Sequence, residues 1–193
     1  MIQQIIKKFG ELYPDICVEI FINNSKTIRE KIDRSELDFA LVEEFPQMDA
    51  YITEPFFEDR NIVVVPVGHH LLQKENVKAK DLTEEKLLLR EKGSGVRNLF
   101  DAVMSSRNLI IHPVWESYTS DALIEAVKAE IGIAVLPERI ARPHINRGEM
   151  KELTVSDLDL RRRLIMFRHR SSILSEEGTH FWELVKHFDW NVE

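Results

Sequence analysis

The stretch Ser120–Pro137, SDALIEAVKAEIGIAVLP, decides the fold class of this chain. The apolar residues of its first part recur at helical spacing, at Leu123, Ile124, Val127 and Ile131. Gly132 ends the predicted helix, and the short apolar run Ile133–Pro137 that follows is typical of a buried strand. A helix followed at once by a buried strand is the repeating element of α/β folds.

The same alternation of helices and strands extends in both directions. Strands are predicted over Ile16–Ile22, Asp38–Val42, Tyr51–Pro55, Ile62–Val67, Leu87–Arg90, Leu109–Trp115, Met150–Leu153 and Leu164–His169. Helices are predicted over residues 2–13, around Ile28 and Ile32, over Val96–Ser105 and Glu138–Asn146, and around Phe181–Phe188. The order favours an α/β fold with mostly parallel sheets flanked by helices.

The composition is that of a globular protein. The chain has 193 residues, enough for one domain or two small lobes, with 44% hydrophobic and 31% charged residues. No apolar run reaches the ~18 residues of a membrane helix, and no signal peptide is recognisable. The single cysteine, Cys17, fits a reducing cytosol and lies in a strand pattern, so we expect a buried structural thiol. These features predict a cytoplasmic protein.

The charge pattern argues against direct binding to DNA. The formal net charge is −7, whereas a free-standing DNA-binding domain usually carries a basic face. The one dense basic cluster is Arg161-Arg162-Arg163, which we interpret as the solvated entry to a strand. We therefore expect no nucleic acid binding by this chain on its own.

Several stretches carry a resemblance to a known family. They are FGELYPDI (Phe9–Ile16), LDFALVE (Leu37–Glu43), VVPVGHHL (Val64–Leu71), LREKGSGVR (Leu89–Arg97), SDALIEAVKAEIGIAVLP (Ser120–Pro137) and LRRRLIMF (Leu160–Phe167). In this order and at this spacing they resemble the effector-binding domain of LysR-type transcriptional regulators, over nearly the whole chain. The resemblance implies a two-lobed fold of the type 2 periplasmic-binding-protein kind. Lobe I would comprise residues 1–65 and 139–193, and lobe II residues 66–138.

Two parts of the family pattern have no counterpart in this sequence. The first is the helix-turn-helix with its linker helix. DNA contact would therefore need an N-terminal domain that is missing here. The other is the strand and Ser/Thr loop that open the effector domain, because Met1 already falls in the first predicted helix. A sheet without that strand leaves backbone groups unpaired. We expect a truncated or misassigned start, or another segment that fills the gap.

The candidate site follows from helix N-termini, whose unpaired N–H groups attract anions. Such starts are predicted at Asn24 and Ser25, at Ser94 and Gly95, and at Thr119 and Ser120. The resemblance implies that these positions, with Glu43, line a cleft between the lobes. Arg97 is a possible cationic partner for an anion, or an exposed helix residue. Glu43 favours an amine-bearing effector or faces solvent. Ordinary helix capping explains the hydroxyls equally.

The predicted function is therefore the sensing of a small, anionic or amino-acid-like metabolite, without catalysis, cofactor or metal. His69 and His70 lie in a turn and lack a second ligand pair at zinc spacing. The alternatives are a stand-alone solute-binding protein and a small dehydratase of the same fold, although no acid or base is evident. The resemblance also implies a homodimer formed through the 1–12 helix, the 16–22 strand and the 122–129 helix.

Overall fold

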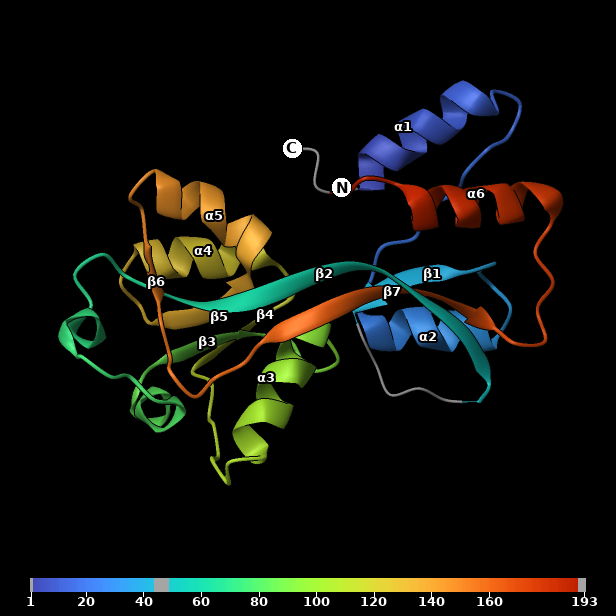
Figure 1. Ribbon diagram of the computed structural model, residues 1–193. Helices are drawn as coiled ribbons and strands as arrows, with labels where there is room; N and C mark the ends of the chain where they lie inside the picture. Colours follow the sequence, from blue (N-terminus) through green and yellow to red (C-terminus); the bar gives the residue numbers. More distant parts are fainter. Residues whose placement is uncertain (1, 44–48, 191–193) are drawn as a thin grey trace. The chain divides into compact units, whose positions relative to one another are not determined.

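The computed structural model describes residues 2–43 and 49–190, and the chain divides into two compact units. Unit 1 comprises Met1–Glu58 and Arg163–Glu193, and unit 2 comprises Asp59–Arg162. The chain passes from one unit to the other within β2 (Tyr51–Val65) and again at the start of β7 (Arg161–His169) (Figure 1). Each unit is described by itself below.

Unit 2 contains a mixed sheet. β3 (Leu87–Arg90) pairs in parallel with both β4 (Trp115–Ser117) and β5 (Ile133–Pro137). The C-terminal part of β2 pairs antiparallel with β5 and with β6 (Lys151–Leu153). The sheet of unit 2 is therefore mixed rather than mostly parallel as predicted. The strands β3, β4 and β5 are parallel, but β2 runs antiparallel to β5 and β6.

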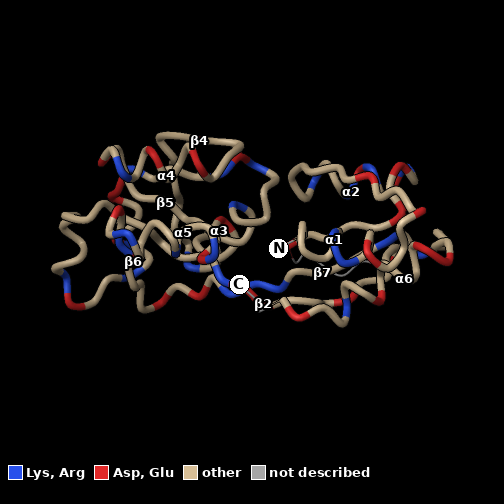
Figure 2. Tube along the Cα trace, turned by 90° about the horizontal axis from the view of Figure 1, so that it is seen from above, with Lys and Arg blue, Asp and Glu red and all other residues tan. Residues whose placement is uncertain are grey.

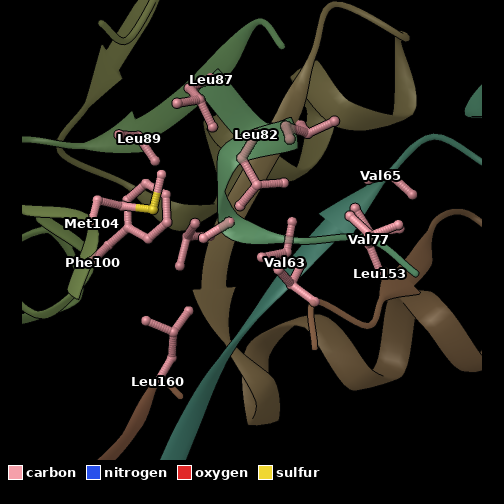
Figure 3. Packing of buried hydrophobic residues seen from close by; sticks show 14 of the residues in the cluster. Val63, Val65, Val77, Leu82, Leu87, Leu89, Phe100, Met104, Leu153 and Leu160 are labelled. Carbon is pink, nitrogen blue, oxygen red and sulfur yellow. The ribbon is translucent and has the colours of Figure 1, made fainter. Parts of the chain in front are cut away.

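The strand residues of unit 2 alternate between two faces, as the pleat requires. One face buries Val63, Val65, Leu87, Leu89, Ile133 and Val135. Phe100 and Met104 pack on this face, as do Leu82 and Leu160 from flanking segments (Figure 3). The opposite face buries Ile62, Val64, Leu88, Ala134 and Leu136. Both faces are covered, which explains why these strands read as continuous apolar runs in the sequence.

Helices cover the two faces of this sheet (Figure 1). α3 (Gly95–Ser105) lies on one face, and α4 (Ser120–Lys128) and α5 (Glu138–Asn146) lie on the other. Short 3-10 helices η1 (His70–Gln73) and η2 (Ala79–Glu84) connect β2 to β3. The grouping differs from the predicted lobes, since residues 59–65 and 139–162 belong to unit 2. The reason is that β2, α5 and β6 all contact β5 or its neighbours.

Unit 1 is built around two apolar clusters. Its elements are α1 (Ile2–Leu12), α2 (Ser25–Asp33), β1 (Ala40–Glu43), most of β7, and α6 (Glu176–His187). α1 packs on α6 through Ile5, Phe9, Phe181, Trp182 and Val185. α2 packs on the antiparallel pair β1 and β7 through Ile28, Ile32, Val42, Ile165 and Phe167.

The predicted strand over Ile16–Ile22 does not form among the described residues. These residues are not assigned to a strand, and residues 17–23 make no backbone–backbone hydrogen bond to any described residue. Ile20 is 51% and Ile22 is 79% exposed, and Cys17 is exposed rather than buried. The alternating pattern is present, but a strand also needs a neighbour to pair with.

Three further predictions need correction. Tyr51–Pro55 and residues 62–65 belong to one continuous strand, β2, which ends before Pro66 and Val67. The strand predicted over Leu109–Trp115 begins only at Trp115, because Pro113 has no N–H to donate to a ladder. Arg162 is not solvated, since its side chain is 7% exposed and donates to the Asp59 carboxylate at 2.9 Å.

Charges of both signs are distributed along both units (Figure 2). Within the described ranges, no helix has the length and apolar character needed to cross a membrane.

A charged network in unit 2 provides a test of stability against pH. The Arg60 guanidinium and then Arg142 hold the pKa of Glu138 down at about 2, against an ordinary value of 4.5. Because the pKa of Glu138 is lower in the folded state, this carboxylate stabilises the protein at pH values above its unfolded-state pKa of about 4.5. The stabilisation is lost as the pH falls through about 2. We expect Glu138→Gln to cost about 1–2 kcal/mol at pH 7, after allowance for partial exposure, and almost nothing near pH 2.

The measurement is urea unfolding of both proteins across this pH range. Glu11→Gln is the control, because Glu11 is largely exposed and lies 4.0 Å from a single exposed lysine. A difference between Glu138→Gln and the parent chain that stays constant with pH would contradict the assignment.

Candidate functional site

The polar residues of unit 2 gather at one edge of its sheet. β3 and β4 are parallel, and the register places Arg90 opposite Ser117 at their carboxyl ends. The Glu91 N–H continues this pairing by donating to the Ser117 carbonyl at 3.1 Å. Because parallel strands end at the same edge, the loops that lead into α3 and α4 leave from neighbouring positions.

The loop before α3 contributes the hydroxyl of a buried residue, Ser94. Gly93 has a φ of 96°, a conformation that glycine adopts without strain, and it lets the chain turn into the helix. Ser94 is the N-cap residue, and its N–H donates to the Glu91 carbonyl at 3.2 Å. The Ser94 side chain is 5% exposed but makes no capping hydrogen bond. Its hydroxyl and the Gly95 N–H are therefore not committed to closing the helix.

The turn before α4 contributes two further hydroxyls. Thr119 is the N-cap, and its Oγ1 accepts a long hydrogen bond of 3.4 Å from the Ala122 N–H. The Ser117 hydroxyl bridges this turn by accepting from the Thr119 N–H at 3.1 Å. Ser120 is buried, and its Oγ accepts from Arg90 Nη1 at 3.4 Å. The hydroxyls of Thr119 and Ser120 thus have protein partners, although their hydrogen bonds of 3.4 Å are at the outer limit of length.

Arg97 is a buried structural residue rather than an exposed one. Its side chain is 4% exposed and donates to Asp101 at 2.7 Å and to Glu116 at 3.1 Å. It also donates to the Arg90 carbonyl at 3.2 Å, so it ties α3 to the ends of β3 and β4. Arg90 itself is paired with Glu91 at 2.9 Å. The two arginines at this edge are thus neutralised locally, and the hydroxyls and helix N–H groups are further donors for a ligand.

The candidate residues of unit 1 lie at the start of α2 and the end of β1. Asn24 caps α2, because its side-chain oxygen accepts from the Thr27 N–H at 3.0 Å. Ser25 is the first residue of that helix. Glu43 ends β1 opposite Leu164 of β7. The predicted loop beyond it, Glu44–Pro46, lies outside the described residues.

Unit 1 also contains a half-open pocket of about 680 Å³. It is lined by α1, by residues 16–23, by Ile28 of α2, by residues 36–41 and by the start of α6. In the described part of the chain, β1 pairs on one side only, with β7. Ala40 and Leu41 of β1 are among the residues that line the pocket.

Sequence reasoning missed some of the residues that organise the edge of unit 2. Arg90 and Glu91 lie inside the quoted stretch LREKGSGVR, at the end of the predicted strand Leu87–Arg90. That position is a signal, because polar residues at the carboxyl ends of parallel strands line ligand sites. Glu116 carries no such signal in the sequence, since its role depends on the non-local contact with Arg97.

The fold and these sites define a class of protein, namely a two-unit α/β domain with the periplasmic-binding-protein-like fold. The match to solved structures is extensive. The regulatory domain of Synechocystis PCC6803 CcmR, solved in complex with 2-PG, has a TM-score of 0.86 and 24% identity over 96% of this chain and 89% of that chain. The effector-binding domain of QuiR, solved with shikimate, has a TM-score of 0.83 and 18% identity over 97% and 92%.

The chain belongs to the LysR substrate-binding domain family, whose model matches residues 1–189. Among curated proteins, it is 28% identical over 160 residues to the HTH-type transcriptional regulator CysL of Bacillus subtilis (strain 168). It is 27% identical over 177 residues to the uncharacterized HTH-type regulator YeiE of Escherichia coli (strain K12). The matches cover 83% and 92% of this chain, but only 54% and 60% of those relatives.

Proposed function

We propose that this chain is the effector-sensing domain of a LysR-type regulator and that it binds a small anionic or amino-acid-like metabolite. The observation that carries the proposal is the Ser94 hydroxyl, which caps nothing although the residue is buried and precedes α3. Thr119 and Ser120 lie at the same edge of the unit 2 sheet and are held by long hydrogen bonds that a ligand can replace. Asn24, Ser25 and Glu43 remain the predicted contributors from unit 1.

The proposed action is a shift between conformations rather than catalysis. A metabolite moves such an equilibrium only by the difference of its affinities for the two states. In the relatives, which are named as helix-turn-helix regulators, the part that this chain does not cover accounts for nearly half of the length. We propose that DNA contact belongs to that part, and that the protein acts in the cytoplasm.

We also propose that two copies pair through α1 and the 16–22 segment. Support comes from the exposed apolar side chains of this region, Leu12, Ile20, Phe21 and Ile22. The contribution predicted for residues 122–129 has less support. Leu123, Ile124, Ala126 and Val127 are buried in the core of unit 2, so the apolar stripe of α4 faces its own sheet.

A thermal-shift screen against sulfate, acetylserine, amino acids, dicarboxylates and aromatic acids tests the effector site. A ligand at 100 times its Kd adds about 2.7 kcal/mol of stability. We expect Ser94→Ala and Thr119→Ala to weaken binding of the compound found by about tenfold, the effect of one lost hydrogen bond. Thr119→Ala should also lower the basal stability by about 1 kcal/mol through loss of a cap.

The matched control is Ser175→Ala, which removes the N-cap of α6 in unit 1, where the Ser175 hydroxyl accepts from the Gly178 N–H at 3.0 Å. It should lose similar basal stability and keep the full ligand shift. A ligand whose shift survives both Ser94→Ala and Thr119→Ala would disprove the assignment of this edge. A screen in which no compound stabilises the chain would reject the proposed function.

A further inference from the structure

Two histidines and one carboxylate converge in unit 2, between β2 and β3. His69 is the N-cap of η1, His70 begins that short helix, and Glu85 follows η2. The Nε2 atom of His69 lies 3.4 Å from Glu85 Oε2, and Nε2 of His70 lies 3.0 Å from Glu85 Oε1. One ligand atom from each of the three residues lies within 4.8 Å of the others.

Packed turns hold these side chains in place. Leu71 of η1 and Leu82 of η2 are buried in the same core cluster of unit 2. The Glu85 N–H donates to the Leu82 carbonyl at 3.3 Å, which fixes the backbone that carries the carboxylate. The side chains of His69 and Glu85 are 13% and 14% exposed, whereas that of His70 is 69% exposed. The backbone that carries the cluster is thus held by the core of unit 2, and the cluster is open to solvent through His70.

We propose that His69, His70 and Glu85 bind a divalent transition-metal ion of the zinc type. Two imidazole nitrogens and a carboxylate are a donor set that such ions accept, with water in the fourth position. Ligand atoms about 2.0–2.2 Å from a tetrahedral ion lie roughly 3.3–3.5 Å from one another. The two nitrogen–oxygen distances are close to this value. All three ligand atoms lie within 4.8 Å of one another, so side-chain rotations that move them by about an ångström bring them to the spacing that the ion requires.

The tautomer of His69 sets the cost of binding. His69 Nδ1 accepts from the Leu71 N–H at 3.4 Å, which places the ring proton on Nε2. Coordination through Nε2 moves that proton to Nδ1 and gives up this contact. The lost bond is long and therefore weak. Because changes at His69 would also disturb the turn, the informative variants are those of His70 and Glu85.

The consequence of the site is a cross-link between η1 and the end of η2, which stabilises the folded chain when metal is bound. The metal ligands lie between residues 69 and 85, and no proposed effector residue lies in this stretch. Metal binding and metabolite binding are therefore separate properties, and the failure of one leaves the other in place.

The test is calorimetric titration of the chelator-treated full chain with Zn²⁺, together with Co²⁺ absorption as a report of tetrahedral nitrogen and oxygen ligation. We expect one ion per chain, and a raised Tm with Zn²⁺. His70→Asn and Glu85→Gln should each weaken Zn²⁺ binding at least tenfold. The matched control is His187→Asn. His187 is 73% exposed and lies 3.4 Å from Glu183, and the pair is not part of the three-residue group, so this variant should bind as the parent chain does.

Equal Zn²⁺ affinity in the parent chain and in His70→Asn would overturn the proposal and leave the cluster as a hydrogen-bonded turn. A loss in His187→Asn as large as in His70→Asn would overturn it as well, because binding would then be scattered over surface histidines. If Glu85→Gln fails to fold, His70→Asn still decides, since the His70 side chain is exposed.

Discussion

Asp59→Ala is expected to destabilise the protein by about 3–5 kcal/mol, the cost of removing one member of a buried ion pair. The side chains of Asp59 and Arg162 are each 7% exposed, and Arg162 Nη2 donates to Asp59 Oδ2 at 2.9 Å. The pair joins the first and last residues of unit 2. Its loss should therefore appear as a large fall in the denaturant midpoint, measured by urea unfolding.

Two variants separate this charge effect from a general effect of mutation. The double variant Asp59→Ala/Arg162→Met removes both charges, and we expect it to recover most of the lost stability. Arg163→Met is the matched control, because the neighbouring pair Arg163–Glu58 is 58% and 83% exposed with a separation of 3.6 Å. Exposed pairs contribute less than about 1 kcal/mol. A double variant no more stable than Asp59→Ala would show that the pair is not the source of the effect.

Gly132→Ala is expected to cost about 3 kcal/mol because its new methyl group has no room. A Cβ at this position would lie 2.2 Å from the Lys86 carbonyl oxygen. That oxygen accepts from the Ile133 N–H at 2.9 Å, where β5 enters the sheet beside β3. Since the obstacle is backbone, relief requires β3 and β5 to separate, and the loss should be visible in thermal unfolding.

Gly68→Ala is the control for this prediction. A Cβ on Gly68 meets nothing within 4 Å, so we expect a change of less than about 0.5 kcal/mol. If Gly132→Ala and Gly68→Ala unfold at the same temperature, the close approach at Lys86 carries no energetic weight.

The local neutralisation of arginines bears on the choice of effector. Arg97 and Arg90 are each paired with carboxylates, so neither arginine offers a free positive charge at the edge of unit 2. Hydroxyls and helix N–H groups suit a small carboxylate or the carboxylate of an amino acid. A screen should therefore include zwitterions as well as simple anions.

The sequence by itself determined the elements whose signals are local. α2 begins at Ser25 because the Asn24 side chain caps it, and α4 is followed by a short turn and then β5 in the stretch Ser120–Pro137. The periodicity of the apolar residues places each of these helices and strands to within a few residues. The order of the matching stretches also identified the family, because that order is a property of the chain alone.

Only the tertiary structure decided what depends on contacts between distant residues. Residues 16–22 alternate as a strand does, yet no described segment pairs with them, so they form no strand and Cys17 is exposed. Arg162 meets Asp59, Arg97 meets Glu116, and the two adjacent histidines meet Glu85 only after folding. Burial and pairing of charges are set by the neighbours that the fold supplies, which no local pattern in the sequence records.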